Sequence, residues 1–420
     1  MKNNIWKKFI LSDLSGKVVT TFKDIFLGIY FLKISQGNIV NVSMYFIAMY
    51  FTYPVLLYII NHVFSKINLV KIFRIGLFVN LFKCIILLLS GKGIVNYIIV
   101  FGIVDALGDA LYYYAQQILI KRINNDGNFN RYFTVNYIVK SVFGIVMPVI
   151  FGYCITKNSY ILAFDILTLF TLFSLMMSFT LKIENIEHKK IDIKKFKEMI
   201  KHNNQTKMMK LITYKTFARG LSSYGVLSSL ITIVTYMIVK NEFSLGNISS
   251  FITAISIIII YILGKYVNRK KLSKSFVPLA VIQSFVILLL SFYMIFGDVN
   301  ATICNSTVTL GFVLVLAYNI VNGICNPIFE YSNNIIYYEC MVKQKIEKEY
   351  EITYNFIFET ILNIARATGY VILILISMAN FNLNIVAFMI LGFTLIYIVF
   401  SYLLKEIEQK YLKEWRCKYC

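Results

Sequence analysis

The sequence has few of the residues that build metal centres or disulfide frameworks. Its 420 residues include only three histidines and seven cysteines. The histidines at positions 62, 188 and 202 fall in expected loops or at the edge of an apolar segment, which argues against a transmembrane metal cluster. The cysteines are odd in number and scattered, so no disulfide framework is indicated. The C-terminal pair Cys417 and Cys420 has neither a second pair nor a nearby histidine, so we predict no metal and no cofactor.

Nucleotide-binding and catalytic signatures are also missing. The sequence contains no G-x-x-x-x-G-K-[ST] loop, the pattern whose backbone amides cradle nucleotide phosphates. No clustered His, Asp or Ser residues that an intramembrane enzyme would need stand out on facing apolar segments. We therefore predict that the protein is not an enzyme and is not driven by ATP.

Charge is scarce and apolar runs are long. Charged residues make up 15% of the sequence, hydrophobic residues 58%, and the mean hydropathy is +0.68. A membrane-spanning helix needs about 20 mainly apolar residues, and runs of this length without polar alternation argue against a β-barrel. The expected spans are 18–34, 39–62, 72–90, 94–118, 133–155, 160–181, 211–239, 248–264, 277–296, 308–338, 352–378 and 384–404.

Positive charge is nearly absent from every second connection between these spans. Of the 42 Lys and Arg residues, the odd-numbered connecting stretches, termini included, hold 31 and the even-numbered ones hold three, and the other eight lie within the spans. Because cytoplasmic loops collect Lys and Arg, the pattern predicts twelve spans with both termini in the cytoplasm. The net charge of +21 then reflects topology and anionic lipid headgroups, and we predict no nucleic-acid partner.

Internal repeats divide the chain into halves. The segment 65–73 and the segment 268–276 share the pattern basic-x-x-Leu-x-Lys-x-Phe, and the openings of the fifth and eleventh spans match at 134–141 and 353–360. A long hydrophilic stretch separates the halves, and residues 191–200 within it have the pattern of an amphipathic helix on the inner membrane surface. The expected organisation is an N-terminal six-helix bundle, a cytoplasmic linker, and a C-terminal six-helix bundle with a short cytoplasmic tail, at 1–181, 182–210 and 211–420.

These features resemble the major facilitator superfamily over nearly the whole chain. The loop Gly264-Lys-Tyr-Val-Asn268-Arg269-Lys-Lys271 resembles the family signature G-x-x-x-D-R-x-x-R/K, with Asn268 in place of the usual Asp. The resemblance implies an all-α integral membrane protein with twelve transmembrane helices in two pseudo-symmetric six-helix bundles. It also implies rocker-switch transport, with Arg269 in a cytoplasmic gate. The stretch 144–152, with Pro148 inside it, resembles the fifth-span motif of the antiporters in this superfamily, although an ordinary kinked helix fits equally well.

Ionisable residues within the apolar spans are the candidate site, because such groups are costly in a bilayer unless paired or wetted. Asp105 and Asp109 lie four residues apart on one face of the fourth span. They could bind a proton or a cationic solute, or pair with a neighbouring Lys for structure. Lys140 and Glu359 occupy matching places in the two halves and could form an inner gate. Lys140 could instead reach the headgroups.

The eleventh span carries a polar stripe that includes Asn363 and Arg366. Arg366 needs a carboxylate partner or an anionic part of the substrate, and Glu330 in the tenth span is the partner we favour. Lys215 and Arg219 of the seventh span lie near its expected cytoplasmic end, where their side chains are predicted to reach the headgroups.

Together these residues favour a secondary transporter of a small or amphipathic solute, working in efflux and coupled to protons. The alternatives are a flippase for lipids or lipid-linked glycans, and a non-transporting membrane receptor or immunity protein. The expected partners are the solute, membrane lipids and protons, and we expect a monomer. An excess of Ile, Lys and Asn suggests an AT-rich genome and thus a bacterial plasma membrane.

Overall fold

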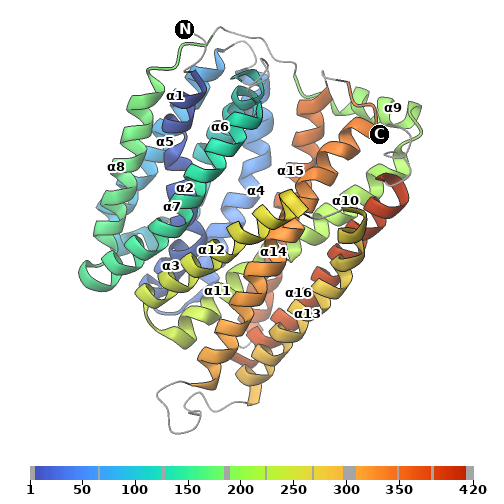
Figure 1. The fold of residues 1–420 in the computed structure, drawn as a ribbon. Helices are drawn as coiled ribbons and strands as arrows, with labels where there is room; N and C mark the ends of the chain where they lie inside the picture. Colours follow the sequence, from blue (N-terminus) through green and yellow to red (C-terminus); the bar gives the residue numbers. More distant parts are fainter. Residues whose placement is uncertain are drawn as a thin grey trace. The chain divides into compact units, whose positions relative to one another are not determined.

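Over the residues it describes, the computed structural model consists mainly of long α-helices (Figure 1). The predicted all-α membrane fold is confirmed. The terminal pair Cys417 and Cys420 lies outside the residues that the structure describes, and so does Asn268. The described residues are 5–64, 67–123, 129–183, 190–222, 225–266, 269–296, 309–347, 350–379 and 383–412.

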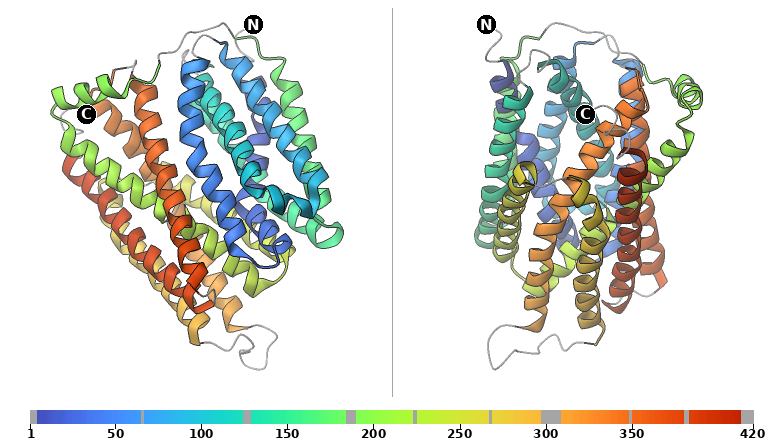
Figure 2. Two further views of the ribbon diagram at one scale, coloured as in Figure 1. Left: turned by 180° about the vertical axis from the view of Figure 1, so that it is seen from behind. Right: turned by 45° about the vertical axis from the view of Figure 1, so that its right-hand side comes forward.

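The chain divides into two compact units, Met1–Lys190 with Asn241–Ser250, and Ile191–Lys240 with Phe251–Cys420. We call these the first and the second bundle. The first contains α1 (Ile5–Ser12), α2 (Leu14–Phe22), a π-helical turn (Lys23–Leu27), α3 (Gly28–Ile34), α4 (Ile39–Val63), α5 (Leu69–Ser90), a 3-10 turn (Gly91–Tyr97), α6 (Ile98–Ile123), α7 (Phe129–Asn158) and α8 (Tyr160–Ser178). Its helices α4, α5 and α6 lie side by side (Figures 1 and 2).

The second bundle begins with a short helix, α9, and ends in a π-helical turn. The helix α12 starts in the first bundle and continues in the second, because its residues up to Ser250 belong to the first. The remaining elements are α9 (Ile193–His202), α10 (Thr206–Leu221), α11 (Val226–Val239), α12 (Glu242–Tyr266), α13 (Arg269–Phe296), α14 (Leu310–Lys343), α15 (Glu351–Ala379), α16 (Leu383–Glu406) and the π turn Ile407–Leu412.

Ten helical stretches of the described chain are long and apolar enough to cross a membrane. Each of the twelve expected spans coincides with a helix or a broken helix. The third and fourth spans fall within one continuous stretch, Leu69–Ile120, which bends through the 3-10 turn at Gly91. The first expected span lies in the interrupted run α1 to α3. Hydropathy therefore locates the spans, while the breaks within them depend on local packing.

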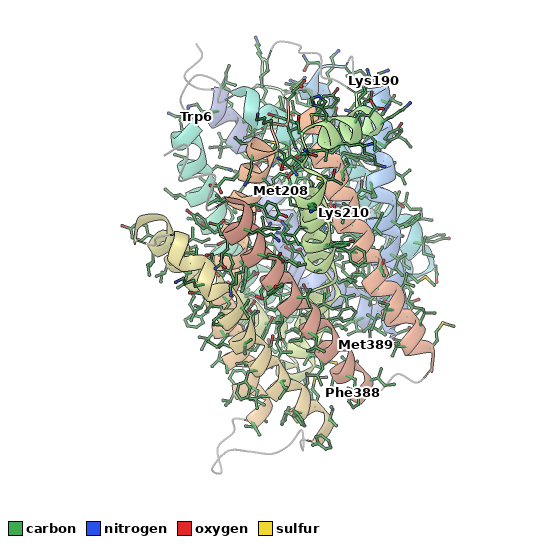
Figure 3. All side chains as sticks on the ribbon, turned by 90° about the vertical axis from the view of Figure 1, so that its right-hand side faces the viewer. Trp6, Lys190, Met208, Lys210, Phe388 and Met389 are labelled. Carbon is green, nitrogen blue, oxygen red and sulfur yellow. The ribbon has the colours of Figure 1, made fainter. Side chains whose placement is uncertain are left out.

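Apolar side chains cover the outside of the helices as well as their inner faces. On α16, Phe388 is 63% exposed while its neighbour Met389 is 6% exposed, and both are labelled in Figure 3. On α10, Met208 is buried and the nearby Lys210 is exposed (Figure 3). An apolar exposed face is what a lipid-facing helix requires, because hydrocarbon is its solvent there.

The seventh span is broken between α10 and α11. A Cβ on Gly225 would overlap the carbonyl oxygen of Gly220, so this tight break depends on glycine. The helix also begins at Thr206, five residues before the expected start at position 211. Arg219 therefore lies about 20 Å from the start of the helix at 1.5 Å per residue.

The amphipathic helix predicted at 191–200 forms as α9, capped by Asp192. Its apolar residues Phe196 and Ile200 are buried, and the Phe196 ring lies 6.2 Å from that of Tyr354. The apolar face of α9 therefore packs on protein in the second bundle, and its position at the membrane surface stays a prediction.

Candidate functional site

A cluster of four charged side chains lies inside the first bundle. Lys23 Nζ is 2.8 Å from Asp105 Oδ2 and 2.7 Å from Asp109 Oδ2. Lys83 Nζ is 2.5 Å from Asp105 Oδ1 and 3.8 Å from Asp109 Oδ1. The Tyr45 hydroxyl also donates to Asp105. Two cations thus face two carboxylates, the balance that permits charge in a low-dielectric interior.

The two carboxylates of this cluster differ in their surroundings. The Asp105 side chain is 1% exposed and is held by both lysines and by Tyr45. The Asp109 side chain is 16% exposed. The sequence placed the carboxylates on one face and left open a pairing with lysine, and the structure pairs both of them. Asp109 is therefore the more exposed of the two carboxylates.

A π-helical turn positions Lys23. The turn Lys23–Leu27 interrupts the run of α-helix between α2 and α3. A π turn adds a residue to the helical repeat and rotates the side chains that follow it, and such turns recur at functional sites. Lys23, its first residue, contacts the carboxylates of α6.

A second buried carboxylate of the first bundle, Asp13, escaped the sequence analysis. It is 0% exposed, and Lys140 Nζ lies 3.0 Å from its Oδ2. Gln116 donates to Asp13 Oδ1 at 2.5 Å, and the Tyr112 hydroxyl donates to the same oxygen. Asp13 precedes the first expected span, so no pattern marked it. Lys140 therefore has an ion-pair partner in its own bundle, and a gate formed with Glu359 stays a prediction.

In the second bundle, Glu330 pairs with Arg219 and not with Arg366. The Arg219 Nη2 to Glu330 Oε2 distance is 2.5 Å. The expected pairing of Glu330 with Arg366 was wrong. The sequence placed Arg219 near the cytoplasmic end of its span, so Arg219 was not considered as the partner of Glu330. Arg219 of α10 instead reaches Glu330 of α14.

Arg366 lies beside Asn363 and Glu359 on α15. Its Nη1 donates to Asn363 Oδ1 at 3.3 Å, and Asn363 Nδ2 donates to the Glu359 carbonyl at 2.8 Å. Glu359 interacts electrostatically with both Arg366 and Arg219. The stripe that the sequence predicted on the eleventh span is therefore one side of a connected charge cluster.

Lys215 completes this cluster. Lys215 is 2% exposed, and its Nζ donates to Asn333 Oδ1 at 2.7 Å. The prediction that the Lys215 side chain reaches the lipid headgroups is therefore wrong. Among the described residues the cluster combines three cations (Lys215, Arg219 and Arg366) with two carboxylates (Glu330 and Glu359). Its charge is cation-rich, in contrast to the balanced cluster of the first bundle. Arg269 begins α13, and its side chain lies outside the described residues.

A model of the Major Facilitator Superfamily matches residues 19–332. The chain belongs to the Major Facilitator Superfamily. It is accordingly a multi-pass membrane transporter of small molecules and not an enzyme. No curated protein sequence matches it at a significant level.

Solved structures of other superfamily transporters share the fold. The nucleoside transporter NupG aligns with a TM-score of 0.68 at 13% identity, over 97% of this chain and 99% of that chain. A bacterial homologue of the iron transporter ferroportin, in an inward-facing state, aligns with a TM-score of 0.60 at 13% identity, over 95% and 98%. A bacterial metal transporter aligns with a TM-score of 0.60 at 12% identity, over 98% and 100%. At these identities the similarity concerns the fold.

In this superfamily member, the antiporter-like stretch of α7 packs very closely on the start of α12. A Cβ on Gly152 would lie 2.5 Å from the carbonyl oxygen of Glu242. A Cβ on Gly246 would overlap the carbonyl oxygen of Pro148. The Ser250 hydroxyl donates to the Ile145 carbonyl at 2.6 Å. Lys33 at the end of α3 forms an ion pair with Glu242. The glycines therefore permit backbone contact between two helices, as in small-residue membrane packing.

Replacing Gly152 by Ala should lower the free energy of unfolding by about 1–3 kcal/mol, because the added methyl group meets backbone and not a movable side chain. Thermal unfolding of the purified protein in detergent measures the change. Gly392→Ala is the matched control, since a Cβ at that helical position meets nothing within 4 Å. Equal melting temperatures for both variants would contradict the close packing.

Proposed function

We propose that this transporter exports a small amphipathic solute that carries an anionic group, by alternating access coupled to protons. The observation that carries the proposal is the cation-rich cluster of the second bundle. Guanidinium groups within a membrane span are costly, and an anionic group on the solute stabilises them. Arg219 and Arg366 are the groups assigned to that anion, with Glu330 and Asn363 orienting them.

Asp109 is our candidate for the coupling proton. It is more exposed than Asp105, and Lys23 bridges the two carboxylates. Protonation of Asp109 removes one of the two negative charges that hold Lys23, so Lys23 and the first span become free to move. This links proton entry to rearrangement of α2 and α3 within the first bundle. Asp105 keeps Lys83 and the fold in place.

Export is favoured over import by the antiporter-like stretch 144–152 and its glycine-based packing on α12. A location in a bacterial plasma membrane fits the composition of the sequence. Because no nucleotide-binding loop accompanies the spans, the driving force in this proposal is the proton gradient.

An unbiased comparison of solutes in cells with and without the gene should first supply a transported solute. In proteoliposomes, an imposed pH gradient should then raise the transport rate of this solute by at least about tenfold, a factor that corresponds to ~1.4 kcal/mol. Asp109→Asn should abolish this acceleration while leaving downhill exchange. Asp165→Asn is the control, because Asp165 forms no ion pair within the described chain. Flux that ignores the pH gradient in the unaltered protein would end the coupling proposal.

A further inference from the structure

A polar cavity of about 50 Å³ lies within the second bundle, between α11, α13, α14 and α16. By the same measure a single water needs roughly 10–15 Å³, so the cavity accommodates a larger group than one water. Leu227 and Ile287 provide its apolar wall. Its polar lining is uncharged and consists of Ser228, Gln283, Tyr318, Asn322, Asn326 and Tyr397.

Hydrogen bonds fix one side of this cavity. The Tyr397 hydroxyl donates to Gln283 Oε1 at 2.8 Å, and Gln283 Nε2 donates to Asn322 Oδ1 at 3.0 Å. Gln283 and Tyr397 are both buried. The wall is therefore preorganised, with the amide orientations set by a chain of three side chains.

The other side of the cavity presents hydrogen-bonding groups with no protein partner in the described part of the chain. These are the amide of Asn326, the hydroxyl of Ser228 and the Nδ2 of Asn322. Asn326 is midway along α14, so these groups lie near mid-bilayer depth. These side chains are accessible from the cavity, so a group bound there can form hydrogen bonds with them.

A polar stripe on α14 connects this cavity to the charged cluster. Asn322, Asn326, Glu330, Asn333 and Tyr337 follow one another at steps of three or four residues, the spacing of a single helical face. The stripe passes from the cavity to the Arg219–Glu330 pair and then to the Lys215–Asn333 contact. From Asn326 to Glu330 and Asn333 is roughly 6–10 Å at 1.5 Å per residue.

We propose that the cavity is a subsite for an uncharged hydrogen-bonding group of the transported solute, a carboxamide or hydroxyl. The inference rests on the proposed function, because the anionic group of the same solute occupies the cation-rich cluster. The transported class is then a small organic anion with an amide or hydroxyl roughly 6–10 Å from its acidic group, the span of four to seven helical residues.

The chemistry of the lining selects for this class. Asn side chains offer a donor and an acceptor together, which matches a carboxamide in two hydrogen bonds. No charged side chain lines the cavity, so a second ionised group would be desolvated there without a counterion. A purely apolar tail would leave Asn326 and Ser228 unsatisfied, and sites that hydrogen-bond a substrate reject the analogue lacking that group.

Matched probes test the subsite. Adipamate and suberamate carry a carboxylate and a terminal amide, while hexanoate and octanoate have the same chain lengths and no amide. Thermal stabilisation of the purified protein and counterflow in proteoliposomes would be measured for each probe. We expect the amides to bind at least about tenfold more tightly, the effect of one good hydrogen bond.

The variant Asn326→Leu should remove this preference while leaving the affinity for the simple carboxylates unchanged. Asn334→Leu is the control, since Asn334 lies on the exposed face of the same helix and outside the cavity lining. An equal or absent response of the unaltered protein to the two members of each pair overturns the inference. So does a preference that survives in Asn326→Leu, the result expected if the cavity holds only water. The proposed function fails separately, if the protein moves no solute in the unbiased screen.

Discussion

Asparagine in place of Asp105 should lower the free energy of unfolding by about 3–5 kcal/mol, the effect of removing one partner from a buried ion pair. The substitution removes the carboxylate that lies 2.5 Å from Lys83 and 2.8 Å from Lys23. Lys83 is then left with Asp109 at 3.8 Å as its carboxylate neighbour. Two lysines face one carboxylate, and the surplus charge has no route to water because Lys83 is 4% exposed.

Thermal unfolding in detergent, followed by tryptophan fluorescence or by aggregation, measures this loss. Asp165→Asn should leave the melting temperature unchanged, which separates the ion-pair effect from the loss of a carboxylate as such. The double variant Lys83→Met, Asp105→Leu should regain much of the stability, since an apolar pair of similar volume replaces a buried ion pair at little cost. An Asp105→Asn protein as stable as the unaltered one would show that Asp105 does not anchor the cluster.

The spans can be predicted well from the sequence because the hydropathy of a span depends only on the residues within it. Asp105 and Asp109 could be placed together because a spacing of four residues is a property of one helix. Their partners could not, because Lys23 and Lys83 come from two other elements of the bundle, far apart in the sequence. Asp13 was missed for a different reason. It lies in a charged N-terminal stretch that hydropathy assigns to the cytoplasm.

The second bundle shows the limits of a depth estimate made from sequence. Lys215 and Arg219 were expected near the headgroups, and both contact side chains of α14 instead. The helix starts at Thr206, five residues earlier than expected, which hydropathy does not report. The cavity could not be predicted either, since Ser228, Gln283 and Asn326 come from three helices and none is unusual alone.

Glutamine in place of Arg219 should reduce the affinity for the transported solute by at least about 30-fold, or ~2 kcal/mol, the lower end of the effect of truncating a buried charge pair. Arg219 pairs with Glu330 at 2.5 Å and also interacts with Glu359, so it supplies positive charge where two helices meet. Counterflow in proteoliposomes measures the apparent affinity. Lys210→Gln, on the exposed face of the same helix, should leave it unchanged.

A charge exchange separates binding from structure. The double variant Arg219→Glu, Glu330→Arg keeps an ion pair between α10 and α14 but moves the positive charge to α14. If Arg219 binds the anionic group of the solute, the exchange should restore thermal stability relative to Arg219→Gln while transport stays low. Full recovery of both would mean that the pair only holds the helices together, and Arg366 would remain the residue assigned to the anion. Arg219→Lys should retain part of the affinity, because lysine keeps the charge but lacks the two-pronged geometry of guanidinium.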